Sequence, residues 1–136
     1  GTRLSTAVVA KRQGVPLPFL TKIAADLARA GLLEASRGAG GGISLRRPPQ
    51  DISMLDVLEA LEGPVTLNRC VSTPDFCPHT DYCGLHEVWA EAQADLINRL
   101  RDTSFAQLAQ RTRVLQERVG QVTGPLNHTV SQAVQT

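Results

Sequence analysis

Glycine and proline residues divide the first 64 residues of the chain into short segments. Breaks occur at Gly14, Pro16, Pro18, Gly31, the run RGAGGG (37–42), Pro48-Pro49 and Gly63-Pro64. Proline lacks the backbone N–H that helix interiors and central strands need, and glycine readily ends helices in a left-handed conformation. The N-terminal half of the chain must therefore be built from short helices and strands that pack on one another.

The first two segments predict a pair of helices. A helix capped by Ser5 or Thr6 ends at Gly14, and Pro18 suits the first position of a second helix whose C-cap is Gly31. The second helix is amphipathic, with apolar residues at i, i+3, i+4 and i+7: Leu20, Ile23, Ala24 and Leu27. Such a pair is typical of a helix-turn-helix, whose second helix meets base edges in the major groove. A plain helical hairpin explains the same pattern.

Residues 32–47 predict a β-hairpin, with strands at 32–36 and 43–47 joined by the glycine run. Beside a helix-turn-helix this hairpin would be a wing. Arg37 would lie at its tip and Arg46 and Arg47 at its exit, where they would contact phosphates or probe a minor groove. A phosphate-cradling loop is a poorer interpretation, because the run lacks both the Lys-Ser/Thr ending of a P-loop and the GxGxxG spacing.

The charge of the chain is distributed unevenly. Residues 1–47 hold eight basic and two acidic residues, 8 − 2 = +6, whereas residues 48–136 hold six basic and eleven acidic residues, 6 − 11 = −5. This asymmetry fits a nucleic-acid-binding module on a non-binding body, and equally an ordinary solvated surface. No run of eighteen apolar residues and no signal-peptide pattern occurs, so we expect no membrane span and a cytoplasmic location.

One segment, CVSTPDFCPHTDYCGLH (70–86), holds all three cysteines of the chain. It is rich in Pro, Asp and Thr and lacks periodicity, so it is predicted to be a loop. Thiolates and imidazoles are ligands for iron–sulfur clusters and for zinc, and each site needs four ligands. The candidates are Cys70, Cys77, Cys83 and His86. If a helix begins just after Cys83, that thiol and His86 lie on one side of its first turn.

The spacing of these ligands alone leaves an iron–sulfur cluster, a zinc site and free thiols equally open. An odd number of cysteines without any sign of secretion argues against a disulfide framework. His79 also lies in the segment, but it follows a proline with no helical geometry to aim it, so we expect it to be exposed to solvent.

The remaining residues predict further helices. Ser53 can cap one that closes at Gly63, a long one begins at Gly84, and another starts at Thr103 or Ser104. The last two helices carry apolar stripes: Leu85, Val88, Trp89, Ala92, Leu96 and Leu100, then Leu108, Leu115, Val119 and Val122. A partner chain would cover these stripes, unless the chain folds back on itself.

Three motifs together resemble the bacterial Rrf-two family of transcription regulators, which includes the iron–sulfur regulator IscR and the nitric-oxide-sensing repressor NsrR. They are the RGxGGG wing, the helix in RPP-x2-I-x3-DVLEALEGP and the three-cysteine loop, within a match over about residues 4–108. The resemblance implies a mainly α fold with a small β-wing. Its expected parts are a winged helix-turn-helix at 1–63, a cluster-binding loop at 64–86, dimerisation helices at 84–123 and a flexible tail at 124–136.

The resemblance also implies a homodimer that binds a partly palindromic operator in double-stranded DNA under the control of an iron–sulfur cluster. The three cysteines would hold the cluster, and His86 as the fourth ligand favours 2Fe-2S over 4Fe-4S. Where many relatives have Ser-Tyr-Leu-Glu-Gln this chain has PFLTK (18–22), so its base preference should differ. The expected DNA-contacting residues are Pro18, Phe19, Thr21, Lys22, Arg37, Arg46 and Arg47.

Two other classes remain open at this stage. One is a cluster-free or zinc-stabilised member of the family that senses thiol oxidation or a small metabolite through the same residues. The other is an enzyme, which we do not expect, because no Ser-His-Asp set or paired carboxylates fall in a recognisable motif.

Overall fold

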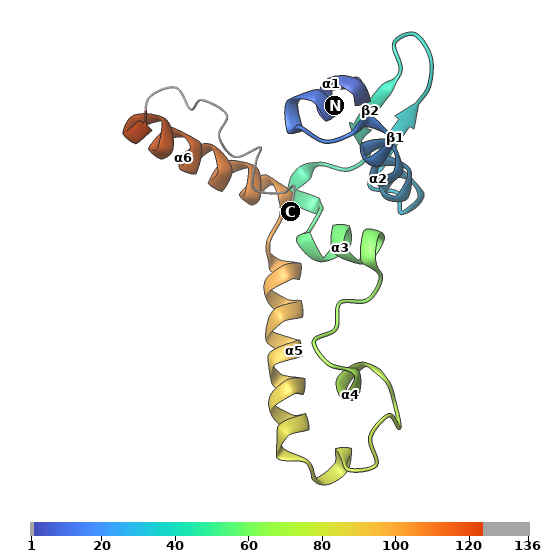
Figure 1. Ribbon diagram of the computed structural model, residues 1–136, viewed down its shortest axis with the longest axis vertical. Coiled ribbons are helices and arrows are strands. Elements are labelled where there is room, and N and C mark those ends of the chain that lie inside the picture. The colour runs from blue at the N-terminus through green and yellow to red at the C-terminus, as the bar shows by residue number, and fades with distance from the viewer. Residues whose placement is uncertain (1, 124–136) are drawn as a thin grey trace.

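The computed structural model describes residues 2–123, which form a small helical domain with a two-stranded sheet, followed by two long helices (Figure 1). The expected mainly α fold with a small β-wing is confirmed. In chain order the elements are α1 (Thr6–Gln13), α2 (Leu17–Arg29), β1 (Leu33–Ser36), β2 (Gly42–Leu45), η1 (Pro49–Asp51), α3 (Met54–Glu62), α4 (Arg69–Ser72), η2 (Thr80–Tyr82), α5 (Gly84–Asp102) and α6 (Phe105–Thr123).

The first two helices follow the glycine and proline signals closely, with small corrections. Ser5 is the N-cap of α1, but its side chain makes no capping hydrogen bond. Gly14 ends α1 in the left-handed region, at φ 65°. Pro18 is the second residue of α2 rather than its first. The helical conformation continues through position 30, so Ala30 is the C-cap of α2. Gly31, which the sequence predicted as the C-cap, is the next residue and adopts a left-handed conformation.

The core is small and joins the helix-turn-helix to the start of the long helices. Its buried apolar residues are Ala10, Ala24, Leu32, Ile52, Leu55 and Leu100. Helix α2 packs against α1, β1 and α3, and α3 in turn packs against α5. The inner side of α2 is therefore held by three neighbouring elements, and its outer side is left exposed.

The predicted wing is present, with shorter strands than expected. Strands β1 and β2 pair antiparallel from Leu33↔Leu45 to Ser36↔Gly42, so Arg46 and Arg47 follow the end of β2. The Arg46 N–H still donates to the Leu32 carbonyl, at 3.0 Å. Leu4 extends the sheet, because its N–H and C=O bond to Ile43 at 2.9 and 2.8 Å. This close approach explains the glycine at position 42: a Cβ there would lie 2.2 Å from the Leu4 carbonyl oxygen.

Ser53 starts α3 as predicted. Its hydroxyl accepts from the Asp56 N–H at 3.0 Å, and the Asp56 carboxylate accepts from the Ser53 N–H at 2.9 Å. This reciprocal capping box satisfies two donors that the first turn of a helix would otherwise leave free. The local sequence therefore fixes where α3 begins.

The turn between α5 and α6 is tied to the start of α3 by main-chain hydrogen bonds. The Met54 N–H donates to the Thr103 carbonyl at 2.8 Å, and the Phe105 N–H donates to the Ile52 carbonyl at 2.9 Å. Thr103 is buried there, and its hydroxyl donates to the Arg99 carbonyl at 2.8 Å. The helix-turn-helix domain and the long helices are thus joined at a hydrogen-bonded junction.

Within the described residues no helix has the length and apolar character needed to cross a membrane. The predicted tail at 124–136 lies outside the described residues.

Candidate DNA-binding surface and cysteine segment

The expected DNA-contacting residues lie on the exposed side of α2 and on the wing. All seven have exposed side chains: Pro18, Phe19, Thr21, Lys22, Arg37, Arg46 and Arg47. Thr21 and Arg37 line the same hollow, of about 190 Å³, between α2 and the wing. The structure therefore brings α2 close to the ends of the two wing strands and to Arg37, which begins the wing turn. The strand register leaves Arg46 and Arg47 at the base of the wing.

The two acidic residues of this domain pair with Arg3 and Arg29 and leave Lys22 and the wing arginines without an acidic partner from residues 2–47. Asp26 pairs with Arg29 at 3.0 Å, and Glu34 pairs with Arg3 at 3.7 Å. Asp26 and Glu34 are the two acidic side chains in residues 2–47, and neither forms an ion pair with Lys22 or with the wing arginines. The positive charge on this side is consequently available to phosphate groups.

The prediction that the cysteine segment is a loop is wrong in part. Cys70 lies on the short helix α4, and a 3-10 turn, η2, follows at 80–82. Each element is about one helical turn, too short to produce the apolar periodicity from which helices are predicted. The rest of the segment is irregular, as expected.

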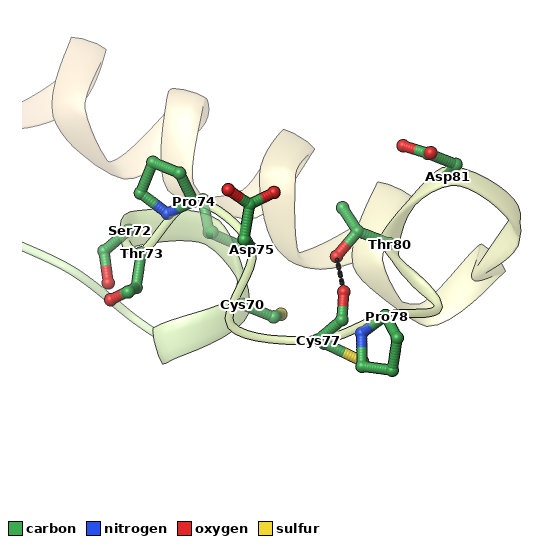
Figure 2. Close-up of a pocket in the computed structure, with 10 residues that line it drawn as sticks. Cys70, Ser72, Thr73, Pro74, Asp75, Cys77, Pro78, Thr80 and Asp81 are labelled. Carbon is green, nitrogen blue, oxygen red and sulfur yellow. Dashed lines mark hydrogen bonds between the residues drawn. The ribbon is translucent and has the colours of Figure 1, made fainter.

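Cys70 and Cys77 both line a cavity of about 480 Å³. Figure 2 shows the two side chains among the residues that line it. Both are free thiols of intermediate exposure. Two contacts stabilise the chain around these cysteines, one between Cys70 and Cys77 and one just after Cys77. The Arg69 guanidinium lies 4.4 Å from the centre of the Phe76 ring, and the Thr80 hydroxyl donates to the Cys77 carbonyl at 2.9 Å.

Cys83 and His86 lie at the start of α5. Cys83 is the N-cap residue, and His86 follows in the first turn. The Nδ1 atom of His86 is buried and has no hydrogen-bond partner among the described residues. A buried polar atom without a partner typically costs about 1–3 kcal/mol, so such an atom calls for an explanation.

His79 is oriented differently. Its ring is exposed, hydrogen-bonds to the Tyr82 hydroxyl, and contacts the Tyr82 ring edge-on with 5.4 Å between centroids.

In the described part of the chain no three Cys, His, Asp or Glu side chains are close enough together to hold a metal ion. Cys70 and Cys77 line one cavity, and Cys83 and His86 lie at the start of α5. As a donor set, three thiolates and an imidazole suit an iron–sulfur cluster or zinc. The donor types therefore fit such a group, although within the described residues no three of these side chains are gathered at one point.

Gln93 is a positioning residue that the sequence analysis did not identify. From α5, its Oε1 accepts from the Leu67 N–H at 2.8 Å and its Nε2 donates to the Val65 carbonyl at 2.6 Å. These bonds fasten the chain that leads into the cysteine segment to the long helix. A polar residue on the same side of α5 as Trp89, Leu96 and Leu100 was the available signal.

The apolar stripes of the long helices are only partly covered. Leu100, at the end of α5, is buried against the rest of the chain, whereas Leu85 and Val88 near its start are 66% and 61% exposed. On α6, Leu115 is 57% exposed. Within residues 2–123, folding back on the same chain does not cover these three side chains.

A helix-turn-helix with a basic β-hairpin beside it, followed by a long helix, defines the winged-helix transcription regulators. The family model described as "Rrf2: Iron-dependent Transcriptional regulator" matches residues 1–111, and the chain belongs to this family. The resemblance identified in the sequence is therefore confirmed.

Similar proteins agree with this assignment. An HTH-type transcriptional regulator of Mycobacterium tuberculosis is 33% identical over 109 residues, covering 80% of this chain and 68% of that protein. The structure of T. potens IscR matches with a TM-score of 0.64 and 27% identity, covering 84% and 74% of the two chains. CymR of B. subtilis, described as the global cysteine regulator, matches at TM-score 0.66, covering 80% and 79%. At 24% identity, this last match shows the fold alone.

Proposed function

We propose that the chain is a homodimeric regulator that works in the cytoplasm and binds a partly palindromic operator in double-stranded DNA. The observation that carries DNA binding is the hollow shared by Thr21 of α2 and Arg37 of the wing. With α2 in a major groove, Arg37 would reach the neighbouring backbone or minor groove. The exposed basic side chains of this domain would supply the salt-dependent part of the affinity.

A second copy of the chain is the proposed cover for the exposed apolar side chains of α5. Leu85 and Val88 lie on one side of a helix of 19 residues, a length that suits helix–helix pairing. Two copies related by a twofold axis would present two recognition helices, which is why the proposed operator has two half-sites.

For the sensor, we infer an iron–sulfur cluster held by Cys70, Cys77, Cys83 and His86, with 2Fe-2S favoured over 4Fe-4S. The supporting observation is the buried, unpartnered Nδ1 of His86, one turn into α5 from Cys83. The relative named IscR and the iron-dependent description of the family point the same way. A cluster would supply one-electron redox chemistry at this position.

This chain's own residues would position the ligands. Gln93 fastens the approach to the segment, and the contact of Arg69 with Phe76 closes the chain between Cys70 and Cys77. Because no three of these side chains are gathered within the described residues, binding by all four would be coupled to ordering of the segment, as metal binding commonly is.

Anaerobic reconstitution tests the sensor. The full chain should gain iron, acid-labile sulfide and visible absorption, and His86→Ala should lose or shift the visible bands. His86→Cys should hold the cluster with an altered spectrum, and His79→Ala, whose ring faces Tyr82, should behave as the unaltered chain. The proposal fails if reconstituted protein takes up no iron and Cys77→Ser leaves DNA affinity unchanged.

A second candidate is a cluster-free sensor of thiol oxidation, favoured by the two free thiols that line one cavity. Hydrogen peroxide would accept two electrons and two protons from Cys70 and Cys77 and form two waters, leaving a disulfide. Mass spectrometry of peptides after peroxide treatment would detect the bond. Zinc in place of iron, or a small metabolite as the signal, would appear in metal analysis and in ligand titrations of the same preparation.

A further inference from the structure

The start of helix α2 has an unusual surface for a helix expected to read DNA. Phe19 is 56% exposed, and its neighbours Leu17 and Pro18 are also exposed. The apolar residues that hold α2 to its domain lie on the other side, around the buried Ala24. The Phe19 ring is therefore not part of the core, and it projects from the part of the helix that would meet base edges.

This surface has few hydrogen-bond donors. Pro18 has no backbone N–H, and the hydroxyl proton of Thr21 is already donated to the Leu17 carbonyl at 2.8 Å. The N–H of Leu20 is likewise donated, to the Pro16 carbonyl at 3.1 Å. Between residues 18 and 22 only Lys22 has a long side chain that carries donors.

An apolar side chain can distinguish base pairs in the major groove by contact with an apolar group on a base edge. The thymine C5-methyl group is the apolar group displayed there, and phenylalanine is among the side chains that contact it. Lys22 lies three residues after Phe19, on the same side of α2, where its ammonium can reach a phosphate or a guanine edge next to that thymine. The excess of positive charge in residues 1–47 makes DNA, rather than a protein, the partner that this exposed ring suits.

We propose that Phe19 recognises one thymine in each half-site of the operator through the C5-methyl group. The inference rests on the proposed DNA binding and adds to it the chemical group that is read. Base preference at that position then depends on shape and apolar contact, and Thr21 contributes through its methyl group rather than its hydroxyl.

The test begins with selection of binding sites for the full chain from random duplexes at fixed salt concentration. In a selected site, each thymine is replaced singly by deoxyuridine, which removes the methyl group and keeps every hydrogen-bonding atom. At one thymine per half-site, the Kd of the unaltered protein should rise about fourfold, the effect of one lost buried methyl group. At the remaining thymines it should change little.

Protein variants assign the effect to the ring. Phe19→Ala should bind thymine and deoxyuridine duplexes equally at the sensitive position, and Phe19→Leu should keep part of the difference. Val8→Ala removes an exposed apolar side chain from the neighbouring helix α1 and should leave the fourfold ratio unchanged. Because the base substitution is made in the DNA, the measurement on the unaltered protein does not depend on how any variant folds.

The possible results separate the inference from the function on which it rests. A selected site at which no deoxyuridine substitution weakens binding overturns the reading by Phe19 and leaves DNA binding standing. A penalty that persists in Phe19→Ala also overturns it. Failure to select any site, with or without reconstituted cluster, overturns both.

Discussion

Loss of the two hydrogen bonds that the Gln93 side chain makes to Leu67 and Val65 should lower the free energy needed to open residues 64–68 from α5. Each side-chain hydrogen bond contributes about 0.5–1.5 kcal/mol net, and water can replace part of it, because Leu67 is exposed and Val65 only partly covered. Gln93→Leu, which removes both bonds, should therefore ease opening of the 64–68 chain by about 1–2 kcal/mol, or about 5–30-fold. Gln93→Glu keeps an acceptor for Leu67 and loses the donor to Val65, so its effect should be smaller.

Hydrogen–deuterium exchange at the Leu67 amide measures this opening directly, because that N–H donates to Gln93. The exchange rate should increase from the unaltered chain to Gln93→Glu and again to Gln93→Leu. Gln110→Leu is the matched control, since the hydrogen bond that Gln110 accepts, from the exposed Arg113 at 3.1 Å, lies within α6. Equal Leu67 exchange in the unaltered chain and in Gln93→Leu would refute the reasoning.

Three further predictions concern the wing, the charge and the long helix. Gly42→Ala should lower the free energy of unfolding by about 1–3 kcal/mol, because its Cβ would meet the Leu4 carbonyl. Chemical denaturation would show this, with Gly120→Ala, which has open space around it, as the control that should not destabilise. Arg37→Ala should weaken DNA binding and reduce the slope of log Kd against log salt by about one if Arg37 contacts a phosphate; an unchanged affinity would remove the wing from the interface. Leu85→Glu should shift the chain from dimer to monomer in sedimentation, and an unchanged mass would exclude the start of α5 as the dimer contact.

The sequence predicted those parts of the fold that local chemistry determines. Gly14, Ser53 and Gly63 end or begin helices through contacts within a few residues, so their effects can be read without a structure. Helix α4 was missed because a single turn has no periodicity. Gln93 was missed because its partners, Val65 and Leu67, lie more than 25 residues away in the chain.

For the candidate site, too, the sequence predicted what depends on local residues and not what depends on packing. Ligand types and their spacing follow from the sequence, and so does the likeness to the IscR-containing family. How close these four side chains come to one another depends on how α4 and α5 pack, which spacing does not encode. The exposure of Phe19 also required the packing of α2 to be known.

The junction between α3 and the α5–α6 turn has a consequence for how this protein tolerates change. Its two bridging bonds, Met54 to Thr103 and Phe105 to Ile52, use only main-chain atoms. Most side-chain substitutions at these four positions leave the donors and acceptors of these two bonds in place. Only proline at position 54 or 105 removes a donor N–H. The connection between the helix-turn-helix domain and the long helices can therefore be kept while side chains on the exposed surfaces of α2 and α5 are replaced.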